Sequence, residues 1–201
     1  SYVPYLGAYG IEFLKGAAGL PPLLADTPWE YPEEVQQIFD AYVKEGLLNC
    51  MYDGLMLDSL KGRSVSRPAG SNRNAGRAAM SLILQFLDSV SVETQEEIRS
   101  ALKAWMEKDP GFLDSLAGAE NITIKEKATA ILNDDTISTE IEPLHKNFPL
   151  MDRAIHRSDD YLLALSMYSE RIQNTEIMND ENLYGWHQGS GMTYLYNGDT
   201  E

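Results

Sequence analysis

The sequence predicts an α+β chain in which a helical part is followed by an antiparallel β part. Through the first two thirds, apolar residues recur at the three- and four-residue spacing of amphipathic helices. After Asn133-Asp134-Asp135 this spacing stops, and short β-branched or alternating runs take its place. The change of pattern places a boundary within residues 134–142. We therefore expect a helical domain over residues 1–136 and a β domain over residues 137–201.

Five helices are expected in the first part. Two of them begin with capping-box pairs, Thr94 with Glu97 and Thr123 with Glu126. Helix–turn–helix units of this size are typical of a bundle, a solenoid or an α/α toroid, and the lack of a fixed sequence repeat disfavours the solenoid. The expected helices cover residues 11–20, 32–51, 74–90, 94–108 and 123–132.

Four strands are expected in the second part. The clearest signal is Met192–Tyr196, because this run is followed by an Asn197-Gly198 turn. Asp159-Asp160 supplies another turn ahead of an apolar run. The expected strands cover residues 137–141, 151–156, 161–168 and 192–196.

Composition excludes several classes of function. The formal net charge is −15, which disfavours nucleic acid as the main partner, because a nucleic acid needs an extended basic face. No apolar run approaches the length of a membrane span. Cys50 is the single cysteine, so no disulfide framework is expected. Because Ser1 is neither an initiator Met nor the start of a secretory signal, we expect an internal piece of a longer polypeptide, with the remainder as a partner.

One stretch departs from the acidic composition. Residues 61–77 hold five basic side chains and no acidic one. The planar fork of arginine suits carboxylate, phosphate or sulfate. Arg63 and Arg67 are four residues apart and share one face in either a helix or an extended segment. The stretch is either an anion site or a solvated loop with structural ion pairs; its basic residues are Lys61, Arg63, Arg67, Arg73 and Arg77.

Two further clusters carry groups suited to binding sugars. In residues 5–10, glycines bracket two tyrosines, whose phenols can donate, accept or stack. In residues 176–191, acids, amides, an indole and glycines lie close together. A packed turn and a plain polar loop are the respective alternatives. The three histidines are too far apart for a metal-ligand spacing, so no cofactor is expected, with a structural calcium left open.

Taken in order, these clusters resemble segments of the polysaccharide lyase family that includes hyaluronate, chondroitin AC and xanthan lyases. Residues 5–10 resemble the family's Tyr-x-Gly-x-Tyr-Gly segment, and residues 62–67 resemble its Gly-Arg-x-x-Ser-Arg segment. Residues 151–157, 181–186 and 191–197 resemble the opening of its β domain. The resemblance implies the C-terminal part of an incomplete α/α toroid followed by the start of an antiparallel β-sandwich domain.

The resemblance also implies a secreted enzyme that cleaves an anionic, uronic-acid-containing polysaccharide by β-elimination. The family tyrosine that removes the C5 proton and protonates the departing O4 matches Tyr9. Its cleft arginines match Arg63, expected to favour the phenolate of Tyr9, and Arg67, expected to hold a sugar carboxylate. The expected catalytic residues are therefore Tyr9 and Arg63, and the expected substrate-binding residues are Arg67, Tyr5, Glu176, Asn179, Asn182 and Trp186.

Some positions depart from the family pattern. The family's catalytic asparagine and histidine precede Tyr9, and the histidine is expected only a few residues before Tyr2. Because this piece lacks both residues, it is expected to be inactive on its own. Ser190 stands where relatives often have Asp, and His187 where they often have Tyr, which implies a changed subsite preference. Substrates of the hyaluronan or chondroitin type are expected first. The alternatives are xanthan or polymannuronate, or a non-catalytic carbohydrate-binding relative; a toroidal glycoside hydrolase would need a carboxylate pair that nothing singles out.

Overall fold

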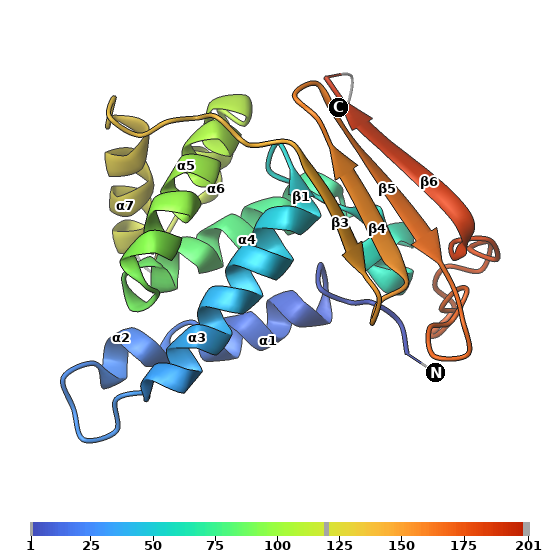
Figure 1. Ribbon diagram of the computed structural model, residues 1–201, viewed down its shortest axis with the longest axis horizontal. Helices are drawn as coiled ribbons and strands as arrows, with labels where there is room; N and C mark the ends of the chain where they lie inside the picture. Colours follow the sequence, from blue (N-terminus) through green and yellow to red (C-terminus); the bar gives the residue numbers. More distant parts are fainter. Residues whose placement is uncertain (1, 119–120, 199–201) are drawn as a thin grey trace.

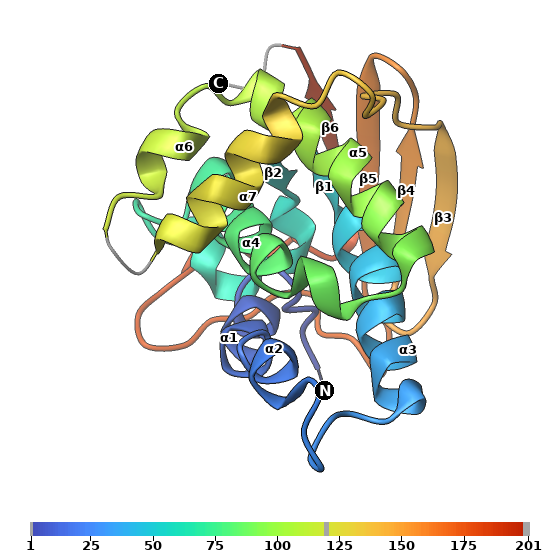
Figure 2. The ribbon, with the colours of Figure 1, turned by 90° about the vertical axis from the view of Figure 1, so that its left-hand side faces the viewer.

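A computed structural model describes residues 2–118 and 121–198. The first part is helical, and the last part is a four-stranded antiparallel sheet that stands beside the helices (Figure 1). Seen from the side, α5 and α7 lie next to each other in front of α4 (Figure 2). The helices are α1 (Tyr9–Ala17), α2 (Leu20–Leu24), α3 (Glu33–Ala41), α4 (Asn72–Phe86), α5 (Val92–Lys108), α6 (Phe112–Ser115) and α7 (Ile122–Leu132).

Short irregular helices and a small hairpin connect these elements. The expected helix over 32–51 is interrupted: α3 passes into a π-helical turn, η1 (Tyr42–Leu47), and then a 3₁₀ turn, η2 (Leu48–Cys50). A hairpin of β1 (Met51–Tyr52) and β2 (Leu55–Met56) follows. The remaining 3₁₀ turns are η3 (Asp58–Leu60), η4 (Gly62–Ser66) and η5 (Leu87–Ser89).

The sheet keeps the order of the chain, β3-β4-β5-β6. Along β5, Leu162, Ala164 and Ser166 are buried while Leu163 and Met167 are exposed, which is the alternation of a sheet covered on one face. The strands are β3 (Leu144–Phe148), β4 (Arg153–Arg157), β5 (Tyr161–Met167) and β6 (Ser190–Asn197).

The expected strand over 137–141 is wrong. Ile137 and Ile141 pack against the helical core instead of pairing in the sheet. The carbonyl of Ile137 accepts a hydrogen bond from Lys103 Nζ at 3.3 Å, and the carbonyl of Ser138 accepts one from a serine of α5 at 2.8 Å. These carbonyls are engaged by helix side chains, and the first strand of the four-stranded sheet, β3, begins at Leu144. The boundary expected between residues 136 and 137 lies in the connection after α7 and stays a prediction.

Helix beginnings also differ from expectation by a few residues. The cap of α5 is Ser91, whose hydroxyl accepts the backbone N–H of Thr94 at 3.3 Å. Thr94 itself is buried in the first turn. Likewise α7 begins at Ile122, one residue before the expected Thr123. In both cases the cap lies before the residue with the strongest sequence signal.

Two apolar cores hold the chain together. The first lies among the helices, and Trp105, Phe86 and Phe112 are its largest fully buried side chains. The second lies between the inner face of the sheet and the β1–β2 and η3 region, where Leu57 and Leu60 meet Leu162 and Tyr196. The second core fixes the sheet against the helical part.

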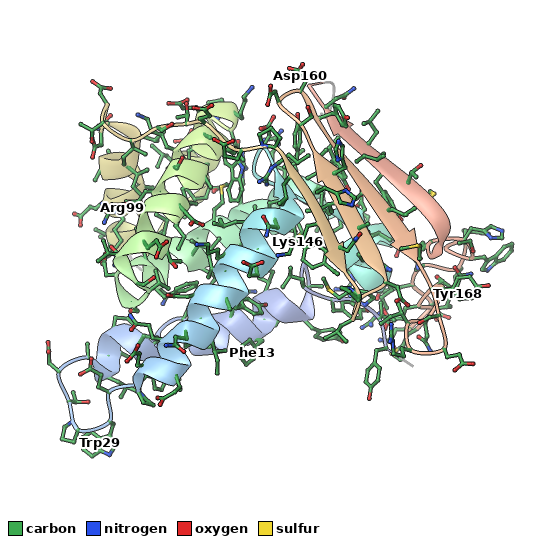
Figure 3. The ribbon with its side chains drawn as sticks, in the orientation of Figure 1. Phe13, Trp29, Arg99, Lys146, Asp160 and Tyr168 are labelled. Atoms are coloured by element: carbon green, nitrogen blue, oxygen red, sulfur yellow. The ribbon has the colours of Figure 1, made fainter. Side chains whose placement is uncertain are left out.

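Polar contacts across the second core fix the same arrangement. Arg153 of β4 is 7% exposed and donates through Nε to the carbonyl of Ser59 at 3.0 Å. The phenol of Tyr196 accepts the backbone N–H of Asp58 at 2.8 Å. Lys146 of β3 pairs with Glu45 of η1, and its side chain lies on the helix-facing side of the sheet (Figure 3). The contacts of Arg153 and Tyr196 place η3, and with it the neighbouring η4, at a fixed position beside the sheet.

The outer side of the helical part carries exposed apolar side chains. Phe13 and Trp29 lie there, away from the sheet (Figure 3). Across residues 2–118 and 121–198, none of the helices has the length and apolar content needed to cross a bilayer.

Candidate active site

The tyrosine pair of residues 5–10 lies where α1 begins. The rings of Tyr5 and Tyr9 meet edge to face, with centroids 4.7 Å apart. The turn is held by the N–H of Gly7, which donates to the carbonyl of Leu60 at 2.9 Å. Tyr9 is 56% exposed, so its phenol is open to a ligand.

Gly62 permits the close approach of η4 to this turn. Its φ is +53°, and a Cβ atom there would lie 2.3 Å from the ring of Tyr5. Any side chain at this position would push Tyr5 away from η4. The glycine at the head of the Gly-Arg-x-x-Ser-Arg segment is thus required by geometry.

Arg63 is buried at the centre of the site, with 6% of its surface exposed. Its Nη2 donates to the phenolic oxygen of Tyr9 at 3.1 Å, and its Nη1 donates to that of Tyr5 at 2.9 Å. Nη1 also donates to Glu176 Oε1 at 2.9 Å, and Nε donates to Glu181 Oε2 at 2.7 Å. The structure therefore brings Arg63 against Tyr9 as the sequence led us to expect, and every guanidinium nitrogen has a protein partner.

The position of Arg67 differs from the one expected for a residue that holds a sugar carboxylate. Its side chain is 47% exposed, and its guanidinium forms a bidentate ion pair with Glu181. Nε donates to Oε1 at 2.6 Å, and Nη2 donates to Oε2 at 2.9 Å. A carboxylate of the chain thus occupies the position in which we expected a sugar carboxylate. Only Nη1 lacks a partner among the described residues, and a substrate contact at Arg67 would have to use it or displace Glu181.

Glu181 is the site residue that the sequence reasoning missed. It belongs to the 181–186 segment but was not assigned a role there. Hydrogen bonds from Arg67, first, and then from Arg63 lower the pKa of Glu181 to about 2, so the carboxylate stays charged at neutral pH. The only signal in the sequence was its position in a motif beside several other acids and amides.

The loop between β5 and β6 supplies the β-side groups. Glu176 accepts the backbone N–H of Arg63 at 3.1 Å as well as its guanidinium. Asn182 is 8% exposed and is turned into the loop, where its amide donates to Gln188 Oε1 at 2.8 Å and to the carbonyl of Glu176 at 2.9 Å. The geometry therefore favours a supporting role for Asn182 over the expected contact with substrate.

Two other expected residues lie further out on this loop. Asn179 is exposed, with a φ of +56°, and Trp186 is 58% exposed with its ring centre 6.3 Å from that of Tyr184. Within the described part of the chain, neither lines the cavity beside Tyr9. That cavity has a volume of about 360 Å³ and is lined by Tyr5, Tyr9, Lys61, Arg63, Arg67 and Asn74, among others.

The other basic residues of the 61–77 stretch have structural partners. Arg77 donates two hydrogen bonds to the carboxylate of Asp109, from Nε at 2.7 Å and from Nη2 at 2.6 Å. These bonds lower the pKa of that carboxyl group. Arg73 lies 3.6 Å from the same carboxylate. Lys61 is buried and pairs with Asp58 at 2.9 Å. Every basic residue of the stretch thus pairs with a carboxylate of the chain, and a site for an external anion at Arg63 and Arg67 stays a prediction.

Across the described ranges, no group of three or more His, Cys, Asp and Glu side chains is gathered as ligands. The chemical groups on offer are a phenol in contact with a guanidinium, a second guanidinium, and two carboxylates that hold them. Such a set can move a proton and bind an anionic sugar.

A helical part joined to an antiparallel sheet, with this tyrosine and arginine at the junction, indicates the class of polysaccharide lyases. Residues 1–104 match the family description "Polysaccharide lyase family 8, N terminal alpha-helical domain", and residues 143–201 match "Polysaccharide lyase family 8, super-sandwich domain". The chain belongs to polysaccharide lyase family 8. The expected fold class, part of an α/α toroid followed by the start of a β-sandwich domain, is confirmed.

Named relatives span several substrates. The chain is 34% identical to a hyaluronate lyase of Thermasporomyces composti, over 98% of this chain and 26% of the relative, and 30% identical to a xanthan lyase of Bacillus sp. strain GL1, over 97% and 21%. Among solved structures, a Paenibacillus xanthan lyase superposes with a TM-score of 0.89 at 31% identity, over 98% of this chain and 19% of that one. The Streptomyces coelicolor A3 chondroitin AC lyase in complex with chondroitin sulphate gives 0.87 at 27%, over 100% and 28%. The chain spans about a quarter of the length of the curated relatives it matches.

Proposed function

We propose that the full-length protein is a lyase that cleaves a uronic-acid-containing anionic polysaccharide by β-elimination. Family membership and the names of the relatives support the enzyme class. The observation that carries the mechanism is the contact between Arg63 Nη2 and the phenolic oxygen of Tyr9, at 3.1 Å. The phenol is exposed to a ligand, and the guanidinium that donates to its oxygen can stabilise negative charge forming there during proton transfer.

In the proposed mechanism, Tyr9 takes the C5 proton of the uronic acid and then protonates the departing O4. Arg63 holds the phenolic oxygen and stabilises the negative charge that forms there. Arg67 binds the anionic polymer through Nη1, which has no partner among the described residues. The sugar carboxylate at the reacting unit is neutralised by the asparagine and histidine that the family resemblance places before Tyr2 in the complete polypeptide.

Among possible substrates, we propose hyaluronan or chondroitin first, because several relatives are named hyaluronate lyases and a solved relative was seen with chondroitin sulphate. Xanthan or polymannuronate is the alternative, supported by the relatives named xanthan lyase. Since such polymers are too large to enter a cell intact, we also propose that the protein is secreted. Activity in the culture medium of the source cells, rather than in washed cells, would support secretion.

An elimination assay on the full-length protein tests the function. The protein is incubated with hyaluronan, chondroitin, xanthan or polymannuronate, and the ultraviolet absorbance of the new C4=C5 double bond is followed. We expect absorbance to rise on at least one polymer and Tyr9→Phe to abolish the rise while binding is kept. Tyr31→Phe is the matched control, because Tyr31 stacks on Phe39 in the helical part, with ring centroids 6.2 Å apart. If the protein binds a polymer but the absorbance rises on none of the four, a non-catalytic carbohydrate-binding protein is favoured.

A further inference from the structure

We propose that Glu181 is a positioning residue that sets the guanidinium of Arg63 against Tyr9 and holds Arg67 beside it. The kinetic part of this inference rests on the proposed lyase function, while its geometric part does not. Glu181 comes from the β5–β6 loop, and both arginines come from the η4 region of the helical part. The β part of the chain would thus supply the carboxylate that orients Arg63 toward Tyr9, both of which belong to the helical part.

Both oxygens of Glu181 are used. Oε2 accepts from Arg63 Nε at 2.7 Å and from Arg67 Nη2 at 2.9 Å, and Oε1 accepts from Arg67 Nε at 2.6 Å. One carboxylate therefore bridges two like charges that would otherwise repel each other. No neutral side chain of the same size can accept three such hydrogen bonds, because an amide has only one oxygen.

The bridge fixes the direction of Arg63. A guanidinium is planar, so anchoring two of its nitrogens determines where the third one points. Nε is anchored by Glu181 and Nη1 by Glu176, which leaves Nη2 directed at Tyr9, 3.1 Å away. If the Nε anchor is lost, the plane can rotate about the remaining contacts and Nη2 can leave the phenol.

The backbone beside Glu181 is docked to the same helical turn. The N–H of Asn182 donates to Ser66 Oγ at 3.1 Å, and that hydroxyl donates to the carbonyl of Arg63 at 2.9 Å. The carboxylate is thus presented from a fixed backbone and not from a free loop end. This docking is what makes Glu181 able to position Arg63 instead of following it.

The test uses three variants of the full-length protein. Glu181→Gln keeps the size but places an amide NH₂ against a guanidinium, and Glu181→Asp keeps the charge on a shorter side chain. Asp180→Asn is the matched control, because Asp180 is exposed on the same loop, and asparagine tolerates its φ of +60°. Each is measured for kcat and KM on the polymer that the wild type cleaves, and the crystal structures of the wild type and Glu181→Gln are compared.

We expect Glu181→Gln to lower kcat by about 100-fold, with a much smaller change in KM, because a displaced catalytic group costs rate more than binding. Glu181→Asp should recover part of the loss, and Asp180→Asn should match the wild type. In the Glu181→Gln crystal structure, Nη2 of Arg63 should no longer lie within hydrogen-bond distance of Tyr9.

Several results would overturn the inference. Wild-type kcat in Glu181→Gln would do so, as would an effect confined to KM, which would make Glu181 a substrate-binding group. Equal losses in Asp180→Asn and Glu181→Gln would point to the loop as a whole. If no polymer is cleaved by the wild type, the proposed function fails, and the crystal structures still decide the inference: an unchanged Arg63–Tyr9 contact in Glu181→Gln overturns it, and a lost contact supports it.

Discussion

Arg63 lies against Tyr9 with its guanidinium carbon 5.8 Å from the centre of the ring and its Nη2 3.1 Å from the phenolic oxygen. Lysine at position 63 would keep the positive charge but could not hold Tyr9, Tyr5 and two carboxylates at once. We expect Arg63→Lys in the full-length protein to lower kcat by about 100-fold, the usual cost of losing one preorganised donor.

Steady-state kinetics on a cleaved polymer check this expectation. Arg171→Lys is a suitable control, because the side chain of Arg171 is 62% exposed and lies outside the cavity beside Tyr9. If Arg63→Lys retains the wild-type kcat, the orientation of the Arg63 donors does not matter for the reaction.

The low pKa of Glu181 predicts a pH dependence of stability. Its pKa is about 2 in the folded chain, against an ordinary value of 4.5, because Arg67 and Arg63 favour the charged form. The unfolded state therefore binds more protons between these values, so the stabilisation by Glu181 is present above about pH 4.5 and is lost as the pH falls toward 2. Thermal unfolding of the wild type and Glu181→Gln should show a Tm difference that is largest near neutral pH and shrinks on acidification. A difference that is constant across this range would contradict the cause given.

The ion pair between Arg77 and Asp109 is expected to matter for stability. Asp109 is 4% exposed, and Arg77→Ala would leave Arg73, 3.6 Å away, as the remaining cation beside this buried carboxylate among the described residues. We expect the free energy of unfolding to fall by about 3 kcal/mol, as in other buried pairs that lose one member. Denaturant unfolding measures the change. Lys15→Ala should cost far less, since both members of its ion pair with Glu12 are exposed.

Gly76 of α4 is predicted to be intolerant of a side chain. A Cβ atom there would lie 1.7 Å from the carbonyl oxygen of Gly54, in the turn of the β1–β2 hairpin. Gly76→Ala should therefore separate α4 from the hairpin and lower the free energy of unfolding by about 3 kcal/mol.

Gly16 of α1 offers the opposite case. A Cβ atom at this position meets nothing within 4 Å. Gly16→Ala should raise the free energy of unfolding by about 0.5–1 kcal/mol, through helix propensity alone. Equal effects of the two substitutions in denaturant unfolding would show that the contact with Gly54 is not the cause.

Local sequence patterns predicted elements that depend on local causes. The helix expected over 74–90 corresponds to α4, whose apolar spacing and Ser71 cap are local features. The strand prediction for residues 137–141 was wrong because β-branched residues suit either a strand or a packed extended segment. Which of the two forms depends on the side chains of α5, and sequence spacing does not report that neighbour.

The site divides in the same way. Tyr9 and Arg63 were identified together from two motifs and a family resemblance, and the structure brings them into contact. The bridging position of Glu181 could not be inferred, because it depends on how a loop more than a hundred residues later docks on η4. For the same reason, the sequence analysis assigned Arg67 to a sugar carboxylate, whereas in the structure Arg67 pairs with the carboxylate of Glu181.

The two ends of the β5–β6 loop are neighbours in the sheet, since Met167 pairs with Ser190 beside a bulge at Ser166/Met167. A connection whose ends meet in this way can gain or lose residues without shifting the register of the strands that carry it. The register of the sheet therefore does not depend on the length of the segment that carries Glu176 and Glu181. In a family whose named members include hyaluronate and xanthan lyases, this loop is a segment whose length can differ between relatives, provided that its contacts with Arg63, Arg67 and Ser66 are kept.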